Sequence, residues 1–153
     1  PDISFDRSIN PYRGCEHGCV YCFARPTHAY MGLSPGLDFE TRIVAKVNAA
    51  EKLRETFAGR AYKPLMLNIG AATDAYQPIE RKLGITRSVI EVLSECRHPF
   101  SMVTKSSGIE RDLDRLVRTR IHQTRKRCRR DRRFVGRDRN IGRAVAVIVQ
   151  IAR

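Results

Sequence analysis

Apolar and polar residues alternate with two different periods along the first 117 residues. Short runs of strand-like composition occur near residues 3–9 and at residues 41–46, 64–71 and 100–106. Helical periodicity follows the last three of these runs. The order is therefore a strand and a helix repeated about four times. This order predicts an α/β fold with parallel strands and right-handed crossovers.

The predicted helices carry start signals or an apolar face. Asn48 and Glu51 stand at the spacing of a capping box, and Ser107 and Glu110 repeat that spacing further along the chain. The helix expected over residues 84–97 has one apolar face, formed by Ile85, Val89, Val92, Leu93 and Cys96. Both signals support helices that alternate with the strands.

Three polar segments follow predicted strands directly. They are the cysteine-containing loop at residues 13–30, the segment at residues 70–78 and the segment at residues 104–107. In parallel α/β folds the chemistry lies at the C-terminal ends of the strands. We therefore expect these three segments to share one mouth.

Composition adds that the chain is of the globular class. Hydrophobic residues make up 42% of the 153 residues and charged residues 29%. No apolar run approaches the roughly 20 residues that a membrane span needs, which argues against a membrane protein. The first residues contain neither Met nor a signal peptide, so a cytosolic fragment or a trimmed chain is expected. Five cysteines, three of them crowded, fit metal or redox chemistry better than a disulfide framework.

Charge separates the last part of the chain from the rest. The net charge is +13, of which residues 111–153 carry +11. From residue 118 onward neither period continues, so we divide the chain into a barrel-like part at 1–117 and an irregular Arg-rich tail at 118–153. The apolar stretch near the C-terminus is β-prone and has no evident partner, which makes it an aggregation hazard.

The tail allows two interpretations. Its arginines could clamp nucleic acid through phosphate contacts. Alternatively, the reading frame shifts after Asp114, because a displaced frame in a GC-rich gene yields many Arg, Ala, Val and Gly codons. In that case the tail is disordered and the second half of the domain is missing. Family-like sequence in another frame beyond codon 114 would decide for the shift.

The cysteines at positions 15, 19 and 22 form the pattern CxxxCxxC. A structural zinc site has four protein ligands and no open position, and His17 or His28 could supply the fourth ligand. An iron–sulfur cubane held by three thiolates instead leaves one iron open, and the amine and carboxylate of an amino acid could chelate it. The remaining interpretation is that the thiols are small buried side chains.

This pattern and its surroundings resemble a known family. CxxxCxxC with Tyr21 before the last cysteine is similar to radical S-adenosylmethionine (radical SAM) enzymes. The wider string NPYRGCEHGCVYCFARPTHAY, followed by TDAYQPIE and VTKS, resembles the branch related to spore photoproduct lyase, the DNA-repair photolyase-like proteins. The resemblance covers about residues 3–117.

The resemblance implies a fold, two cofactors and a set of site residues. The fold is a partial parallel (β/α) barrel, of which this chain holds the N-terminal half. A 4Fe-4S cluster on Cys15, Cys19 and Cys22 would cleave S-adenosylmethionine reductively, in the cytoplasm, with electrons from a flavodoxin or ferredoxin. The substrate class of this branch is a damaged nucleic acid. The further residues that would contact the cofactor are Tyr21, Thr73, Asp74 and Lys105.

For the cofactor-binding candidates a structural role stands beside the functional one. Thr73 and Asp74 follow a strand where relatives hold the methionine amine, but Asp74 could equally close an Asx-turn. Lys105 could meet the cofactor carboxylate or a substrate phosphate, or be a solvated lysine. Three more residues, Tyr76, Gln77 and Glu80, could line the mouth or merely terminate the strand, and lining is the preferred interpretation.

The remaining histidines, arginines and cysteines are weaker candidates. Arg13, Arg25 and His28 flank the cysteines and could tune a cluster or satisfy loop carbonyls. His98 is expected to be structural. Spore photoproduct lyase uses a further cysteine as hydrogen donor, and neither Cys96 nor Cys128 fits that role well. The alternatives to a radical SAM enzyme are therefore a zinc- or cluster-stabilised nucleic-acid-binding module and an inactive fragment.

Overall fold

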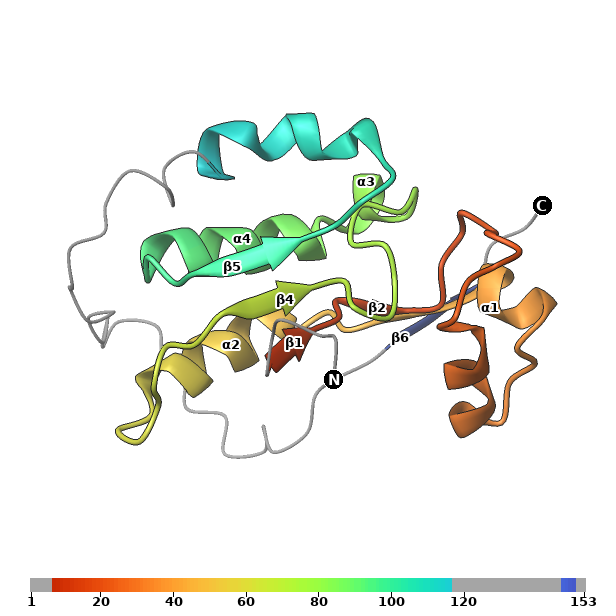
Figure 1. The fold of residues 1–153 in the computed structure, drawn as a ribbon, viewed down its shortest axis with the longest axis horizontal. Coiled ribbons are helices and arrows are strands. Elements are labelled where there is room, and N and C mark those ends of the chain that lie inside the picture. Colours follow the sequence, from red (N-terminus) through yellow and green to blue (C-terminus); the bar gives the residue numbers. More distant parts are fainter. Residues whose placement is uncertain (1–6, 117–146, 151–153) are drawn as a thin grey trace.

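A three-stranded parallel sheet forms the centre of the molecule (Figure 1). The computed structural model describes residues 7–116 and the backbone of residues 147–150. The parallel strands are β1 (Arg7–Ile9), β4 (Leu67–Ile69) and β5 (Phe100–Met102), in the order β1-β4-β5. All three were expected from the sequence. The described residues contain this parallel sheet and no closed barrel.

A second sheet is antiparallel and corrects one prediction. β2 (Tyr12–Arg13) pairs with β3 (Arg42–Ala45), with Tyr12 opposite Ala45. The strand expected over residues 41–46 therefore exists but does not join the parallel sheet. The physical reason is that the chain turns straight from β1 into β2, whose edge β3 occupies, and the Lys46 N–H donates to the Pro11 carbonyl over 2.9 Å. The parallel strand–helix units are three, not about four.

The tail contributes one strand to this second sheet. β6 (Val147–Gln150) pairs antiparallel with β3, in a register that places Val147 opposite Ala45. The prediction of an irregular tail without a partner is wrong for these four residues, because β3 offers them an open edge. Residues 117–146 lie outside the described part, and so does the choice between a nucleic-acid clamp and a shifted reading frame.

The helices alternate with the strands largely as the sequence predicts. They are η1 (Arg25–Met31), α1 (Leu37–Thr41), α2 (Ala49–Ala58), α3 (Glu80–Leu83), α4 (Ile85–Glu95) and η2 (Ser107–Asp112). Asn48 stands at the N-cap of α2, although its side chain makes no capping bond there. Ser106, not Ser107, caps η2, since its Oγ accepts the Gly108 N–H over 3.1 Å. The short helices η1 and α1 had no periodic signal.

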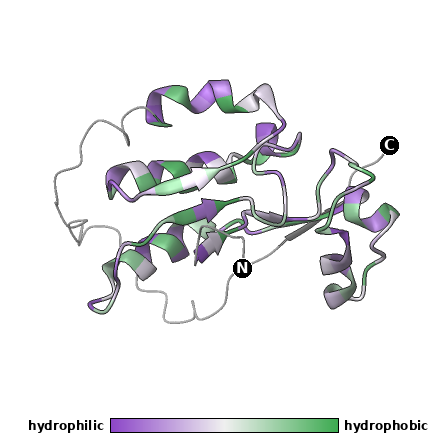
Figure 2. Cartoon of the chain, viewed as in Figure 1, coloured by the Kyte–Doolittle hydropathy of each residue, from purple (hydrophilic) through white to green (hydrophobic). Residues whose placement is uncertain are grey.

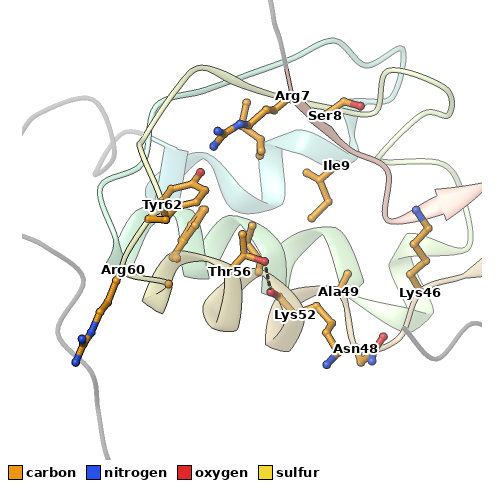
Figure 3. A pocket seen from close by; sticks show the side chains of 15 residues that line it. Arg7, Ser8, Ile9, Lys46, Asn48, Ala49, Lys52, Thr56, Arg60 and Tyr62 are labelled. Carbon is orange, nitrogen blue, oxygen red and sulfur yellow. Dashed lines mark hydrogen bonds between the residues drawn. The ribbon is translucent and has the colours of Figure 1, made fainter. Parts of the chain in front are cut away.

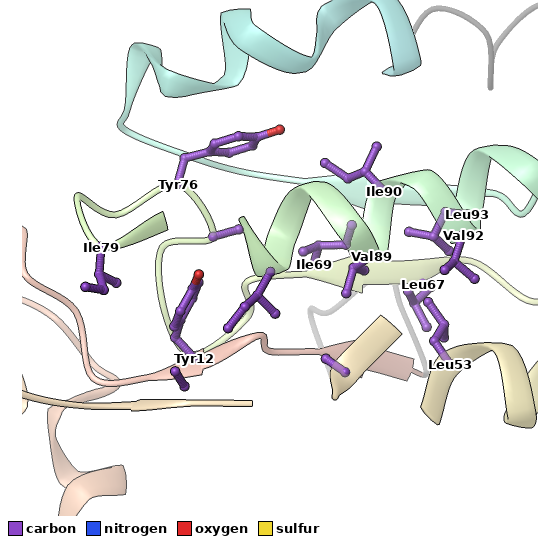
Figure 4. Packing of buried hydrophobic residues seen from close by; sticks show 14 of the residues in the cluster. Tyr12, Leu53, Leu67, Ile69, Tyr76, Ile79, Val89, Ile90, Val92 and Leu93 are labelled. Atoms are coloured by element: carbon purple, nitrogen blue, oxygen red, sulfur yellow. The ribbon is translucent and has the colours of Figure 1, made fainter. Parts of the chain in front are cut away.

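The main core lies between the parallel sheet and the helices α2 and α4, which pack against each other (Figure 4). Leu67 and Ile69 of β4 meet Leu53 of α2 and Val89 and Leu93 of α4 in one buried cluster. Burying each such side chain contributes about 1.5–3 kcal/mol. Hydrophobic and hydrophilic stretches alternate along α4 (Figure 2), which fits its predicted apolar face.

The alternate positions of the parallel strands carry polar side chains. Ser8, Asn68 and Ser101 stand side by side in register, and Asn68 Nδ2 donates to Ser101 Oγ over 3.1 Å. Ser8 and Ser101 are exposed. Successive side chains of a strand point to opposite faces, so this face lies away from the core that α2 and α4 cover. Across the described ranges, no helix is long and apolar enough to cross a membrane.

A buried polar network joins strand β2 to the helices α3, α4 and η2. Glu80 is 1% exposed and accepts bonds from the Tyr12 hydroxyl and the Thr86 N–H. Arg111 bridges Glu80 and Asp112 at 3.0 and 2.8 Å. Burial raises the pKa of Tyr12, and the neighbouring Glu80 carboxylate raises it further. For Asp112, burial acts to raise the pKa, but the bonds and charge of Arg111 outweigh it and the pKa is lowered.

Candidate functional site

The cysteine loop starts at the end of β2 and depends on two glycines with left-handed backbone. Gly14 has a φ of 83° and Gly18 a φ of 62°. A Cβ on Gly14 would lie 2.8 Å from both His28 Cε1 and the Phe39 carbonyl oxygen, so only glycine fits. The Cys15 N–H donates to the same Phe39 carbonyl over 2.8 Å. That bond places the first thiol against the fold.

A tight turn connects the other two cysteines. The Cys22 N–H donates to the Cys19 carbonyl over 3.2 Å, and Arg25 Nε donates to the same carbonyl over 3.1 Å. Arg25 Nη2 also contacts Glu40 Oε1 at 2.5 Å. Arg25 therefore takes the structural one of its two suggested roles and holds the turn through its carbonyl.

The three thiols lie in different surroundings. Cys15 is buried with Ala24 and Phe39, and Cys22 packs against this group, whereas Cys19 is half-exposed. Burial raises the pKa of the Cys15 thiol, and the nearby Asp74 carboxylate and Cys22 thiol raise it further. Cys15 is therefore a neutral thiol at neutral pH, and a bound metal would have to displace its proton.

The loop after β4 holds the cysteine loop from one side. The Gly14 carbonyl accepts bonds from Thr73 Oγ1 over 2.6 Å and from Gln77 Nε2 over 3.3 Å. In return, the Glu16 N–H donates to Gln77 Oε1 over 3.0 Å, and Glu16 Oε2 accepts the Ile79 N–H over 2.5 Å. These residues are about 60 positions apart in the chain, so the contacts are wholly tertiary.

The loop after β5 reaches the cysteines from the other side. Lys105 Nζ lies 3.3 Å from Cys19 Sγ and donates to the Tyr21 hydroxyl over 2.6 Å. The same ammonium lies 4.6 Å from the centre of the Tyr21 ring, a cation–π contact. The bond to Tyr21, and then the bond to Cys19, raise the pKa of Lys105. Lys105 thus brings a positive charge to the exposed thiol.

Asp74 connects all three segments. Its Oδ1 accepts the Tyr76 N–H over 2.8 Å and the Thr104 hydroxyl over 2.7 Å, and its Oδ2 accepts the Lys105 N–H over 2.8 Å. His17 Nε2, from the cysteine loop, lies 3.5 Å from that Oδ2. The bond to Tyr76 is the Asx-turn that the sequence allowed. The predicted common mouth of the three segments is confirmed.

Three residues interpreted as lining this mouth are buried instead. Tyr76 is 3% exposed, Gln77 is fully buried and Glu80 is 1% exposed. Their polar atoms are used inside the fold, for example by the bond from the Tyr76 hydroxyl to Asp112 Oδ2 over 3.0 Å. The interpretation was wrong because their polarity serves packed loops and not solvent.

Other candidates are structural or lie elsewhere. His28 is fully buried with its Nε2 on the Arg42 carbonyl at 3.1 Å, and Arg13 is exposed. His98 is structural, as expected, because it is 3% exposed and stacks on Phe57 with ring centres 4.5 Å apart. Cys96 packs against the main core, and Cys128 lies outside the described residues.

Sequence reasoning missed three residues that hold the site. Asn10 Oδ1 accepts the Ala72 N–H over 2.8 Å, and Glu16 and Thr104 make the bonds described above. Asn10 and Thr104 both follow parallel strands, so their position at strand ends was an available signal. Glu16 offered none, because its partner lies 63 positions away.

The site offers a donor set for a metal cluster without a preformed cage. Across residues 7–116, no group of three or more His, Cys, Asp or Glu side chains is arranged to hold a metal ion. Cys15, Cys19 and Cys22 nevertheless start from one loop, which the loops after β4 and β5 support. Cys19 and Cys22 are half-exposed, so rotation about χ1 can redirect them. Three thiols fit a cluster with one open iron. His28 is committed to the Arg42 carbonyl, which weakens it as a fourth zinc ligand.

Asp74→Ala is expected to destabilise the fold by about 2–4 kcal/mol, because one buried and two part-buried donors lose their acceptor. Urea unfolding followed by circular dichroism measures the loss. Asp74→Asn keeps the bonds to Oδ1, so its free energy of unfolding should lie between those of the unaltered protein and Asp74→Ala. Asp114→Ala is the control, since Asp114 is exposed and its partner among the described residues is Arg115, at 3.2 Å. An equal effect of Asp74→Ala and Asp114→Ala would contradict the bridging role of Asp74.

Comparison with known proteins gives relatives of undescribed function. The chain is 39% identical over 111 residues to the uncharacterised proteins Rv2578c of Mycobacterium tuberculosis and Mb2609c of Mycobacterium bovis. It is 29% identical over 107 residues to the uncharacterised protein MJ0683 of Methanocaldococcus jannaschii. These matches cover 72% and 69% of this chain, but 33% and 38% of the relatives. The chain thus spans little more than a third of their length. No protein-family model and no solved structure matches it.

Proposed function

We propose that the chain is part of a radical SAM enzyme that binds a 4Fe-4S cluster through Cys15, Cys19 and Cys22. The observation that supports this most is the meeting of three strand-end loops at the cysteines. Thr73 and Gln77 hold the Gly14 carbonyl, and Lys105 meets Cys19. A loop that carried its thiols only as packing groups would not need a lysine from another strand beside the exposed one.

The chain's own residues would divide the work of binding. Tyr21 and Lys105 are exposed at the mouth and would contact S-adenosylmethionine, with the Lys105 ammonium facing its carboxylate. Thr73 and Asp74 are 9% exposed and would act from behind, by fixing the loops. A 4Fe-4S cluster held by the three cysteines would supply the electron for reductive cleavage of S-adenosylmethionine.

The protein environment would exclude water and balance charge. Phe39 and Ala24 cover Cys15 on its buried side, which keeps water from that thiolate. Lys105 would add positive charge beside Cys19, and such charge stabilises a cluster held by thiolates. These residues would tune the cluster and would not take part in the reaction itself.

Substrate and partners belong to the whole protein and are proposed more broadly. A nucleic acid with a damaged base is the substrate class that the photolyase-like resemblance suggests. A flavodoxin or ferredoxin would deliver the electron, and the cytoplasm would keep the thiols reduced. The mechanism of cluster chemistry does not depend on these choices.

Anaerobic reconstitution with iron and sulfide tests the proposal. After reduction with dithionite, we expect a 4Fe-4S signal in electron paramagnetic resonance that shifts when S-adenosylmethionine is added, because the cofactor binds the open iron. Released 5′-deoxyadenosine, measured by chromatography, would show that this part of the barrel cleaves the cofactor. One zinc per chain without iron would favour the zinc-stabilised module. A cluster that does not respond to the cofactor would overturn the proposal.

A further inference from the structure

An open groove of about 830 Å³ runs along α2, away from the thiols (Figure 3). The edge strand β1 borders it with Arg7 and Ser8, and α2 borders it with Lys52 and Thr56. The turn after α2 completes it with Arg60. The volume is in the range of small-molecule sites.

The groove combines four cations with an apolar set of lining residues, which includes Ile9, Leu53, Phe57 and Leu67. Arg7, Lys46, Lys52 and Arg60 line it, and none of the described residues that line it is an aspartate or glutamate. Asn48, Thr56 and Tyr62 add neutral polar side chains, and Ser8 borders the groove at the edge of β1. A groove with four cations, and without an acid among its described lining residues, attracts an anion.

Among the described residues, the neighbours of Arg7 and Lys46 do not neutralise the charges of these two side chains. Arg7 donates to the Lys63 carbonyl over 3.0 Å and lies 5.2 Å from the centre of the Tyr62 ring, so neither partner neutralises it. Lys52 meets Glu55 at 2.9 Å in an exposed pair, which is worth little. Burial lowers the pKa of Lys46, and Arg13 lowers it further. An anion in the groove would therefore relieve repulsion that the fold already contains.

The shape of the groove selects an extended anion. Lys46 precedes the N-terminus of α2 and Arg60 follows its C-terminus, so the two stand at opposite ends (Figure 3). The ten residues of α2 span about 15 Å. One phosphate cannot contact both ends, whereas a chain of phosphates can.

We infer that the groove along α2 binds a chain of phosphate groups, with Lys46 and Arg60 as its end contacts. A phosphodiester strand and a linear polyphosphate both have this chemistry. The Lys46 end of the groove adjoins strand β2, which leads into the cysteine loop. The Lys46 N–H donates to the carbonyl of Pro11, the residue before β2. The binding requires no cluster and can fail or succeed independently of the proposed enzyme.

The test uses the full chain without metal and three probes: a six-residue oligothymidylate, tripolyphosphate and inorganic phosphate. Backbone amide shifts in ¹⁵N–¹H spectra are expected at Ser8, Asn48 and Thr56. Either chain-like probe should bind at least tenfold more tightly than single phosphate. Binding of the oligothymidylate alone identifies a nucleic-acid backbone as the source, and binding of tripolyphosphate alone identifies a free polyphosphate.

A pair of matched double variants separates the groove from the basic tail. Lys46→Gln/Arg60→Gln is expected to weaken oligothymidylate binding at least tenfold. It should also reduce the slope of log K against log salt by about 1.4, or about 0.7 for each lost contact. Arg81→Gln/Lys82→Gln removes two exposed charges on α3 and should change neither value. Equal losses in both variants, or amide shifts confined to residues 118–146, would overturn the inference.

Discussion

Each of the single substitutions Cys15→Ala, Cys19→Ala and Cys22→Ala is expected to abolish the 4Fe-4S cluster of the reconstituted protein. Three thiolates already leave one iron without a protein ligand, and two would leave a second iron open. Iron and acid-labile sulfide content, together with the visible absorption of the cluster, measure the loss. The fold should persist in Cys19→Ala and Cys22→Ala, because both side chains are half-exposed, whereas Cys15→Ala also removes a buried packing group.

Cys96→Ala is the matched control for these variants. Cys96 is disulfide-bonded and packs against the main core at the end of α4, away from the cysteine loop, so we expect its substitution to leave the cluster content unchanged. Thermal unfolding of each variant distinguishes loss of ligands from loss of fold. Full cluster content in any one of the three loop variants would show that the thiols do not act as a set.

Glu80→Ala is expected to destabilise the protein by about 3–5 kcal/mol, or to unfold it. Its buried carboxylate accepts bonds from the Tyr12 hydroxyl, from the Thr86 N–H over 2.9 Å and from Arg111 over 3.0 Å. Removing it takes this acceptor from the partly exposed Arg111 and from two buried donors, the Tyr12 hydroxyl and the Thr86 N–H. Each buried donor left without a partner costs about 1–3 kcal/mol. Urea unfolding followed by circular dichroism measures the change.

Two further glutamate variants make this prediction specific. Glu80→Gln keeps the shape and one acceptor, so it should cost less and remain folded enough to measure. Glu95→Ala removes an exposed carboxylate that pairs with Arg54 at 2.9 Å, and it should cost less than about 1 kcal/mol. If Glu80→Ala lowers the free energy of unfolding by no more than Glu95→Ala, the network does not connect β2 to the helices as described.

The local sequence pattern was sufficient to predict the strands and helices whose apolar residues form a regular or continuous run. The strand at 64–71 and the helix at 84–97 were predicted because apolar residues recur with one period, and they appear as β4 and α4. The meeting of three loops at one mouth also followed, since parallel strands place their C-terminal ends together. The strand at 41–46 exists as predicted, but the sheet it was expected to join was wrong. A strand pattern does not encode which edge the strand will join.

What the sequence determined by itself is therefore a set of elements and a cysteine loop, since hydrophobic period and thiol spacing are local properties. Only the tertiary structure decided that Asp74 bridges three loops, that Glu80 is buried and that cations gather beside α2. The bonds of Asp74 to Thr104 and Lys105 span about 30 positions, and that of Glu80 to Tyr12 spans 68. A polar side chain has the same letter whether solvent or a distant donor satisfies it, so its role is set by the chain that folds around it.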